Sequence, residues 1–288
     1  MGCCATLPLR NARGGERARY LTCTIPMTSS RFGVTSQPKP GKEGHVFVNP
    51  VDPASFFAML VYENGGVVRE SIRDEFAGGS WAAFSSALAR TTAGNAGQIG
   101  LYLKEHEITP FINGTGNFRF RYSEFNRKLR REGPLGHADA GAEASAAVEG
   151  RFGDADAEVR AAVEGRFLSM RLHSSRIGIT QPSTLLATGG GSQNLEILQI
   201  MADVFGLDVY VEQQPDAASF GAALRAVQAL RSAEEGGGLV PFDQASFGAF
   251  HRVLAAKPDM HAHGVYTRLL PVYAKTERLV ARQFALRP

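Results

Sequence analysis

Three consecutive glycines after an apolar run are the residues of this sequence best suited to hold a ligand, in the segment "TLLATGGGSQN" at residues 184–194. Without a Cβ, Gly189, Gly190 and Gly191 let a ligand approach the main chain closely. Ser192 is expected to begin a helix, whose free N–H groups and positive dipole end favour an anion such as a nucleotide phosphate. The segment predicts a strand, glycines that line a concave site, and a helix starting near Ser192. A plain strand-to-helix turn with spare glycines is the alternative, because glycines are common in turns.

The residues that follow predict the elements that hold these glycines in place. Gly206 is typical of a helix C-terminus, residues 209–211 favour a short strand, and Asp216 can cap a second helix. Apolar residues recur at helical spacing in both predicted helices: Leu195, Leu198, Met201, Val204 and Phe205 in the first, and Phe220, Ala223, Leu224, Val227 and Leu230 in the second. The order is therefore strand, helix, strand, helix.

This whole stretch, from "LLATGGG" to "ALRAV", resembles the adenosine-binding element of the FGGY carbohydrate kinases. Within that family, "EGHVFVNPVD", "SWAAFSSAL", "EITP" and "LLPVYAKTE" resemble the xylulokinases, so the resemblance covers about residues 43–279. It implies an α/β fold: an actin-like ATPase domain of the ribonuclease H-like type, with a mixed sheet and flanking helices. It also implies that this chain is the C-terminal half of such an enzyme and lacks the N-terminal, sugar-binding domain.

The resemblance implies ATP and Mg²⁺ as cofactors and phosphorylation of D-xylulose to D-xylulose 5-phosphate by the complete enzyme. It places Gly189, Gly190, Gly191 and Asn194 at the adenosine end of ATP, with Trp81 near the nucleotide. From the residues alone, two other roles stay open. Trp81 could pack in the core on one helical face with Phe84 and Leu88, and Asn194 could simply bond the backbone at a helix start.

The remaining parts of a phosphoryl-transfer site are not found in the sequence. In the FGGY kinases that this chain resembles, the catalytic base lies in the N-terminal domain. The nearest match to the family's phosphate-binding turn is residues 33–36, which lie too close to "EGHVF" to leave room for the strand between them. Asp203 and Asp208 are expected to be solvated or structural. The seven histidines show no zinc-like spacing, and His261 and His263 are expected in a loop or helix entry. We therefore assign no catalytic or metal-binding residue, and expect the isolated chain to be inactive.

Two alternatives of other classes follow from the N-terminal residues. The pattern Met1-Gly2-Cys3-Cys4 with Thr6 fits N-myristoylation, so the chain could be a non-catalytic nucleotide-binding or interaction module with a lipid anchor. An unrelated leader joined to a kinase fragment is the other interpretation of these residues. A membrane is a partner only if this terminus is acylated. The other alternative is a product that does not fold stably, because the first strand of the sheet is missing.

Composition agrees with a soluble globular protein, and a cytoplasmic location is expected. Hydrophobic residues are 44% and charged residues 20%, near the average for soluble proteins, and a net charge of +3 is too small to indicate a nucleic-acid partner. The three cysteines lie at positions 3, 4 and 23, which excludes a disulfide framework in the folded region and is consistent with a reducing compartment.

The chain divides into a disordered or atypical leader over residues 1–42 and one domain over 43–288. A flexible insertion is expected around 132–152, where "AAVEGRF" at 146–152 duplicates residues 161–167. Further expectations are a β-hairpin of residues 56–62 and 67–72 around "ENGG", a helix capped by Ser80, and a strand over 97–103. We also expect an irregular connection over 107–121, an exposed basic run over 119–131, and a final helix interrupted or kinked at Pro271.

Overall fold

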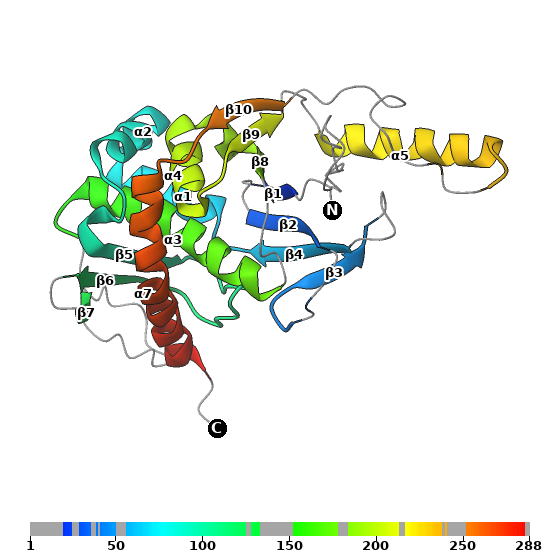
Figure 1. The fold of residues 1–288 in the computed structure, drawn as a ribbon. Coiled ribbons are helices and arrows are strands. Elements are labelled where there is room, and N and C mark those ends of the chain that lie inside the picture. The colour runs from blue at the N-terminus through cyan, green and yellow to red at the C-terminus, as the bar shows by residue number, and fades with distance from the viewer. Residues whose placement is uncertain are drawn as a thin grey trace.

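The computed structural model describes residues 20–24, 29–35, 39, 41–49, 56–124, 128–132, 152–177, 184–212, 217–237, 240 and 252–285. These residues form a seven-stranded mixed sheet, a three-stranded sheet beside it, and helices that pack against them (Figure 1). The strand order of the large sheet is β10-β9-β8-β1-β2-β4-β3. The predicted insertion lies outside the described residues except for its two ends, where Glu132 ends a strand and Phe152 is buried.

The large sheet has three parallel strands at its centre. These are β1 (Tyr20–Thr24), β8 (Thr184–Thr188) and β9 (Val209–Glu212). Antiparallel strands extend it on both sides, namely β2 (Ser29–Thr35), β4 (Phe56–Tyr62) and β3 (His45–Val48) on one and β10 (Arg252–Ala256) on the other. The glycines follow β8 directly, so they lie where parallel strands end, which is the usual place for a ligand in sheets of this kind.

Two segments of the predicted leader are strands of this sheet. β1 pairs with β8 along its whole length, as far as Thr24 and Thr188, and with β2 on its other side. β2 in turn pairs with β4 along its whole length. The expectation that residues 1–42 lack regular structure is therefore wrong for these two segments, and the first strand is present. Cys23 also lies in the sheet, so the folded region is not free of cysteine. Residues 33–35 belong to β2 and do not form a turn.

The second sheet is antiparallel and has the order β5-β6-β7. Its strands are β5 (Gln98–Leu103), β6 (Gly116–Ser123) and β7 (Lys128–Glu132). Two predictions fail here. Most of the supposed irregular connection after residue 115 is β6, and the basic run is not uniformly exposed, because Arg119 is 2% exposed. Arg119 Nε donates to Glu158 Oε1 over 2.7 Å, so a helix far along the chain supplies its counter-charge.

The helices are α1 (Gly66–Phe76), α2 (Trp81–Arg90), α3 (Ala155–Arg176), α4 (Leu195–Phe205), α5 (Ala217–Glu234) and α7 (Met260–Phe284). Residues 67–72, predicted as the second strand of a hairpin, lie inside α1. Val68 and Ile72, four residues apart, are both buried, which is the spacing of one helix face. None of the helices in the described ranges is long and apolar enough to cross a membrane.

Two helices differ from expectation in other ways. α7 runs unbroken through Pro271, and Leu269 and Tyr273 pack into the core on either side of it. The proline removes one helical hydrogen bond, but tertiary packing holds the helix together. α5 extends away from the sheet (Figure 1), and only part of its predicted apolar face is covered: Leu224 is buried, whereas Leu230 is 62% exposed.

α3 is the central helix of the domain and is buried along most of its length. It begins at Ala155, capped by Asp154, six residues before the duplicated segment that was expected to start it. Its predicted apolar stripe is fully buried: Val159, Val163, Phe167 and Met170. Three of its charged residues, Glu158, Arg160 and Glu164, are buried as well and each has a partner of opposite charge, as buried charges require. His173, for example, lies between two carboxylates, with Nδ1 2.8 Å from Glu43 Oε2 and Nε2 2.7 Å from Glu277 Oε1.

Candidate functional site

The turn after β8 is tighter than the sequence predicted. Gly189 has φ +84° and ψ 179°, a backbone conformation that strongly favours glycine. A 3₁₀ turn, η2 (Gly190–Gln193), follows, in which the Ser192 hydroxyl donates to the Gly189 carbonyl over 2.6 Å. The α-helix starts only at Leu195, so the expected helix start near Ser192 is three residues too early.

Asn194 is the N-cap of α4. Its Oδ1 accepts a hydrogen bond from the Ile197 N–H over 3.1 Å, which is the usual geometry of such a cap. The backbone-bonding role that the sequence left open is therefore present. Its Nδ2 makes a different contact, donating over 2.7 Å to Ser85 Oγ on α2. A single side chain thus starts one helix and ties it to another.

Trp81 is the first residue of α2, after the N-cap Ser80. Its side chain is 41% exposed, whereas Phe84, at 5.3 Å in an edge-on contact, is completely buried. The guanidinium of Arg73 lies over the indole at 4.7 Å from the ring centroid. The core role considered for Trp81 is therefore wrong. Phe84 fills the core position, and Trp81 remains accessible at the helix start.

Trp81 and the glycine turn line one cleft, with a volume of about 870 Å³. The prediction that they lie close together is confirmed, although more than a hundred residues separate them. Gly190, Gly191 and Asn194 line the cleft with Trp81, while Gly189 shapes the turn behind them. The other lining residues are Gly66, Arg69, Glu70, Ala82, Ser85, Gln193, Leu195, Glu196 and Ile197.

Three helix N-termini border this cleft, whose charged lining residues are Arg69, Glu70 and Glu196. Gly66, Trp81 and Leu195 line it, and they are the first residues of α1, α2 and α4. The first turns of α1 and α2 contain no acidic residue that would offset the positive end of the helix dipole. Gly190 is open on the cleft side, because a Cβ built there would meet no atom within 4 Å. The arrangement suits an anionic ligand that approaches the main chain.

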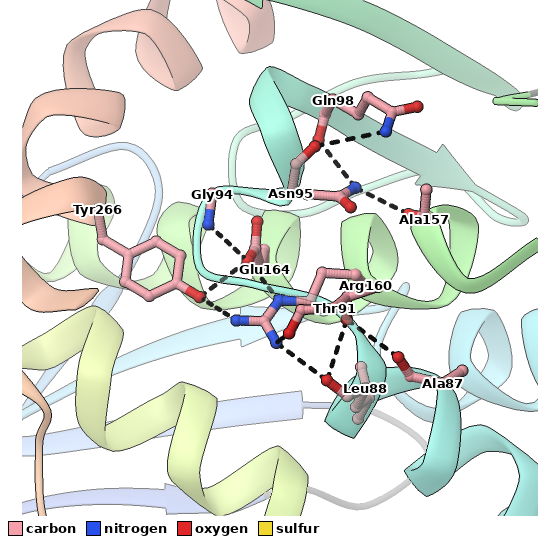
Figure 2. A network of polar contacts seen from close by, with 10 residues as sticks. All are labelled: Ala87, Leu88, Thr91, Gly94, Asn95, Gln98, Ala157, Arg160, Glu164 and Tyr266. Atoms are coloured by element: carbon pink, nitrogen blue, oxygen red, sulfur yellow. Dashed lines mark hydrogen bonds and ion pairs between the residues drawn. The ribbon is translucent and has the colours of Figure 1, made fainter. Parts of the chain in front are cut away.

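A buried polar network anchors the far end of α2 (Figure 2). Arg160, on α3, donates from Nε to Glu164 Oε1 over 2.6 Å and from Nη1 to the carbonyl oxygens of Leu88 and Thr91. Its Nη2 donates to the Tyr266 hydroxyl on α7 over 2.8 Å. Glu164 also accepts from the Gly94 N–H, and its burial raises its pKa although Arg160 opposes this. These contacts fix the helix that carries Trp81.

Comparison with known proteins identifies the family. The model of the FGGY family of carbohydrate kinases, C-terminal domain, matches residues 28–230. The chain belongs to this family. Xylulose kinase of Mus musculus is 40% identical over 262 residues, which cover 90% of this chain and 42% of that protein. Xylulose kinase 2 of Arabidopsis thaliana is 39% identical over 210 residues, covering 72% of this chain and 35% of that protein.

Solved structures show the same fold. A ligand-bound xylulose kinase from Lactobacillus acidophilus has a TM-score of 0.67 at 19% identity, covering 92% of this chain and 48% of that one. The Plasmodium falciparum glycerol kinase with ADP has a TM-score of 0.57 at 12% identity, covering 93% and 47%. The fold is therefore the actin-like ATPase fold of FGGY kinases, as expected. The chain spans less than half the length of these relatives.

Asp203 and His261, two of the other candidates, make local structural contacts in this FGGY domain. Asp203 is 6% exposed and accepts hydrogen bonds from Gln199 Nε2 and the Asp259 N–H; burial raises its pKa. His261 lies in the first turn of α7, where its N–H donates to Asp259, so the predicted helix entry is confirmed. Within the described residues, no three His, Cys, Asp or Glu side chains are grouped to hold a metal ion.

Sequence reasoning missed one polar residue of the FGGY cleft that a simple rule would have found. Ser85 lies four residues after Trp81 in α2 and therefore on the same helix face. Arg69 and Glu70 were missed for a different reason, because the segment that carries them was predicted as a strand.

Proposed function

We propose that this chain is the nucleotide-binding half of a xylulokinase-type enzyme that transfers the γ-phosphate of ATP to the 5-hydroxyl of D-xylulose. ADP and D-xylulose 5-phosphate are the products. The observation that carries the proposal is that Trp81, Gly190, Gly191 and Asn194 line one cleft at the end of the parallel strands. Curated relatives named xylulose kinase support the sugar. A cytoplasmic location is part of the proposal.

In this proposal the main chain of Gly190 and Gly191 receives the nucleotide where no Cβ intervenes. Trp81 offers one ring face to the adenosine, since Arg73 covers the other. Asn194 caps the N-terminus of α4. The positive end of this helix dipole stabilises a negative charge on the nucleotide by about 0.3–1 kcal/mol, and by up to about 2 kcal/mol in a partly buried site. Each of these groups binds and orients the nucleotide. None of them moves a proton.

The cleft fits ATP by its open glycine and its helix starts, and Mg²⁺ would be held mainly by the phosphates. When bound, the ion neutralises charge that develops on the transferring phosphoryl group. We assign no residue of the described chain as its ligand. We also assign no base, which lies in the sugar-binding domain of the enzymes that this chain resembles. Loss of a general base lowers a rate by about 10²- to 10⁴-fold, so we expect this chain alone to bind ATP without D-xylulose-dependent turnover.

Titration of the purified chain with ATP tests the proposal, because Trp81 is its single tryptophan and its fluorescence reports on the cleft. Gly190→Leu places a side chain in the open space beside the turn, and we expect it to weaken ATP binding by at least about tenfold. Gly153→Leu is the matched control. A Cβ at Gly153 would likewise meet no atom within 4 Å, but Gly153 lies before α3, outside the cleft lining.

Two results would contradict the proposal. One is wild-type protein that does not bind ATP, and the other is a Gly190→Leu variant that binds ATP as tightly as Gly153→Leu. ADP release, measured with and without D-xylulose, tests the expected lack of turnover separately. Robust sugar-dependent release by this chain alone would show that it contains a base that we have not identified.

A further inference from the structure

We infer that Ser85 is a positioning residue for the nucleotide: its hydroxyl holds Asn194 and so fixes the α2 wall of the cleft, with Trp81, against the start of α4. This inference rests on the proposed function, because it concerns the same cleft. Ser85 and Asn194 both line that cleft and lie 109 positions apart in the chain. The link between them is the single hydrogen bond from Asn194 Nδ2 to Ser85 Oγ, at 2.7 Å.

The geometry fixes which way the Asn194 amide points. The Ile197 N–H can only donate, and it lies 3.1 Å from one amide atom of Asn194, so that atom must be the oxygen. The amide nitrogen therefore faces Ser85, which accepts. Both ends of the amide are engaged by the protein, and the side chain cannot rotate without losing either the helix cap or the link to α2.

Ser85 differs from its neighbour Ser86 in how it uses its hydroxyl. Ser86 donates to the carbonyl oxygen of Ala82 four residues earlier, over 2.9 Å, which is the common local bond of serine in a helix. For Ser85 no such bond occurs among the residues that the structure describes, and its oxygen accepts from another helix instead. The Ser85 proton and the second N–H of Asn194 then remain as donors at the cleft wall, where nucleotide oxygens and ring nitrogens are acceptors.

Comparison of Ser85→Ala with Ser86→Ala tests the inference. The two variants remove the same group from adjacent positions of one helix, and only the first breaks the link to Asn194. We expect Ser85→Ala to raise the Kd for ATP with Mg²⁺ by about 3- to 10-fold, since one hydrogen bond of ordinary strength is lost. Ser86→Ala should stay within about twofold of the wild type. Calorimetry with ATP gives Kd independently of any change in Trp81 emission.

A purely structural bond between the helices would lower the melting temperature of Ser85→Ala and leave its Kd for ATP unchanged. A third variant tests whether the hydroxyl is the group responsible. Ser85→Thr keeps the hydroxyl and should restore the Kd for ATP to within about twofold of the wild type. The melting temperature of each variant is measured in parallel. If Ser85→Ala binds ATP like Ser86→Ala, or if Ser85→Thr fails to restore binding, the inference is overturned while the proposed function stands. Absence of ATP binding by the wild type would overturn both.

Discussion

Replacing Arg160 with methionine tests whether the buried network behind the cleft holds α2 in place (Figure 2). Arg160 is 6% exposed, and the substitution leaves Glu164, at 2% exposure, without its counter-charge. Breaking a buried ion pair by removing one partner costs about 3–5 kcal/mol. Glu164 keeps the Gly94 N–H and the Tyr266 hydroxyl as donors, and burial already raises its pKa, so protonation relieves part of the loss. We therefore expect the lower end of that range, about 3 kcal/mol.

A loss of this size is readily measured, because a domain has a total stability of only about 5–15 kcal/mol. Urea denaturation, followed by circular dichroism and by the fluorescence of Trp81, gives the change in free energy of unfolding. Arg90→Ala is the control at an exposed ion pair. Arg90 also joins α2 to α3, through two bonds to Asp156 of 2.6 and 2.7 Å, but its side chain is 61% exposed. We expect it to leave the denaturation midpoint almost unchanged, since exposed ion pairs contribute little.

The double variant Arg160→Met with Glu164→Leu sharpens the test. If an unpaired buried carboxylate is the cause of the loss, removing that carboxylate should return part of the lost stability. Equal destabilisation by Arg160→Met and Arg90→Ala would refute the reasoning, because it would mean that burial does not set the strength of these two ion pairs.

Two further predictions concern pH and the glycine turn. Burial opposes protonation of His173, but its hydrogen bonds with Glu277 and Glu43 outweigh burial and raise its pKa above 6.5. The stabilisation from protonated His173 is fully present below its unfolded-state pKa of 6.5 and is lost as pH rises through its higher folded-state pKa. The urea concentration at the unfolding midpoint should therefore decrease as pH rises above about 6.5, and this decrease should be smaller in His173→Gln. An equal decrease in both proteins would contradict this. Gly189→Ala should destabilise by about 1–3 kcal/mol because of the positive φ, and Gly190→Ala by clearly less; equal losses would show that φ does not control the turn.

The elements that the sequence predicted best have apolar residues at a regular spacing and a residue that clearly marks at least one end. The helix that became α4 was expected from its apolar stripe, and its end was expected from Gly206, which has φ +67° as a helix-terminating glycine should. Its start was misplaced, because a 3₁₀ turn of glycine and serine precedes Asn194 and periodicity gives no signal for it. α1 was mistaken for a strand because the β-branched residues in "VVRESI" suit either structure when only a short segment is considered.

Other predictions failed because contacts with residues distant in the sequence determine the structure at those positions. β1 is only five residues long and mixes polar with apolar side chains, so nothing local marks it as the centre of a sheet. Its place depends on β8, which lies about 160 positions later and supplies a parallel partner along its length. Arg119 looked like a surface residue because its counter-charge, Glu158, belongs to another element. The spacing of residues within one segment does not show with which distant segment of the chain it pairs.

The cleft also depends on contacts that the spacing of residues within one segment does not predict. Each helix that borders it follows a local rule: Ser80 and Asn194 are N-caps, and glycines precede α1 and α4. None of these rules says that the helices starting at Gly66, Trp81 and Leu195 meet. Each start carries roughly half a positive charge from its backbone dipole, so their convergence favours an anion even though Glu70 and Glu196 also line the cleft. The proposed binding of a phosphate-bearing ligand thus depends on how three helix starts converge, and the glycine turn is the one part of this site that a single stretch of sequence displays.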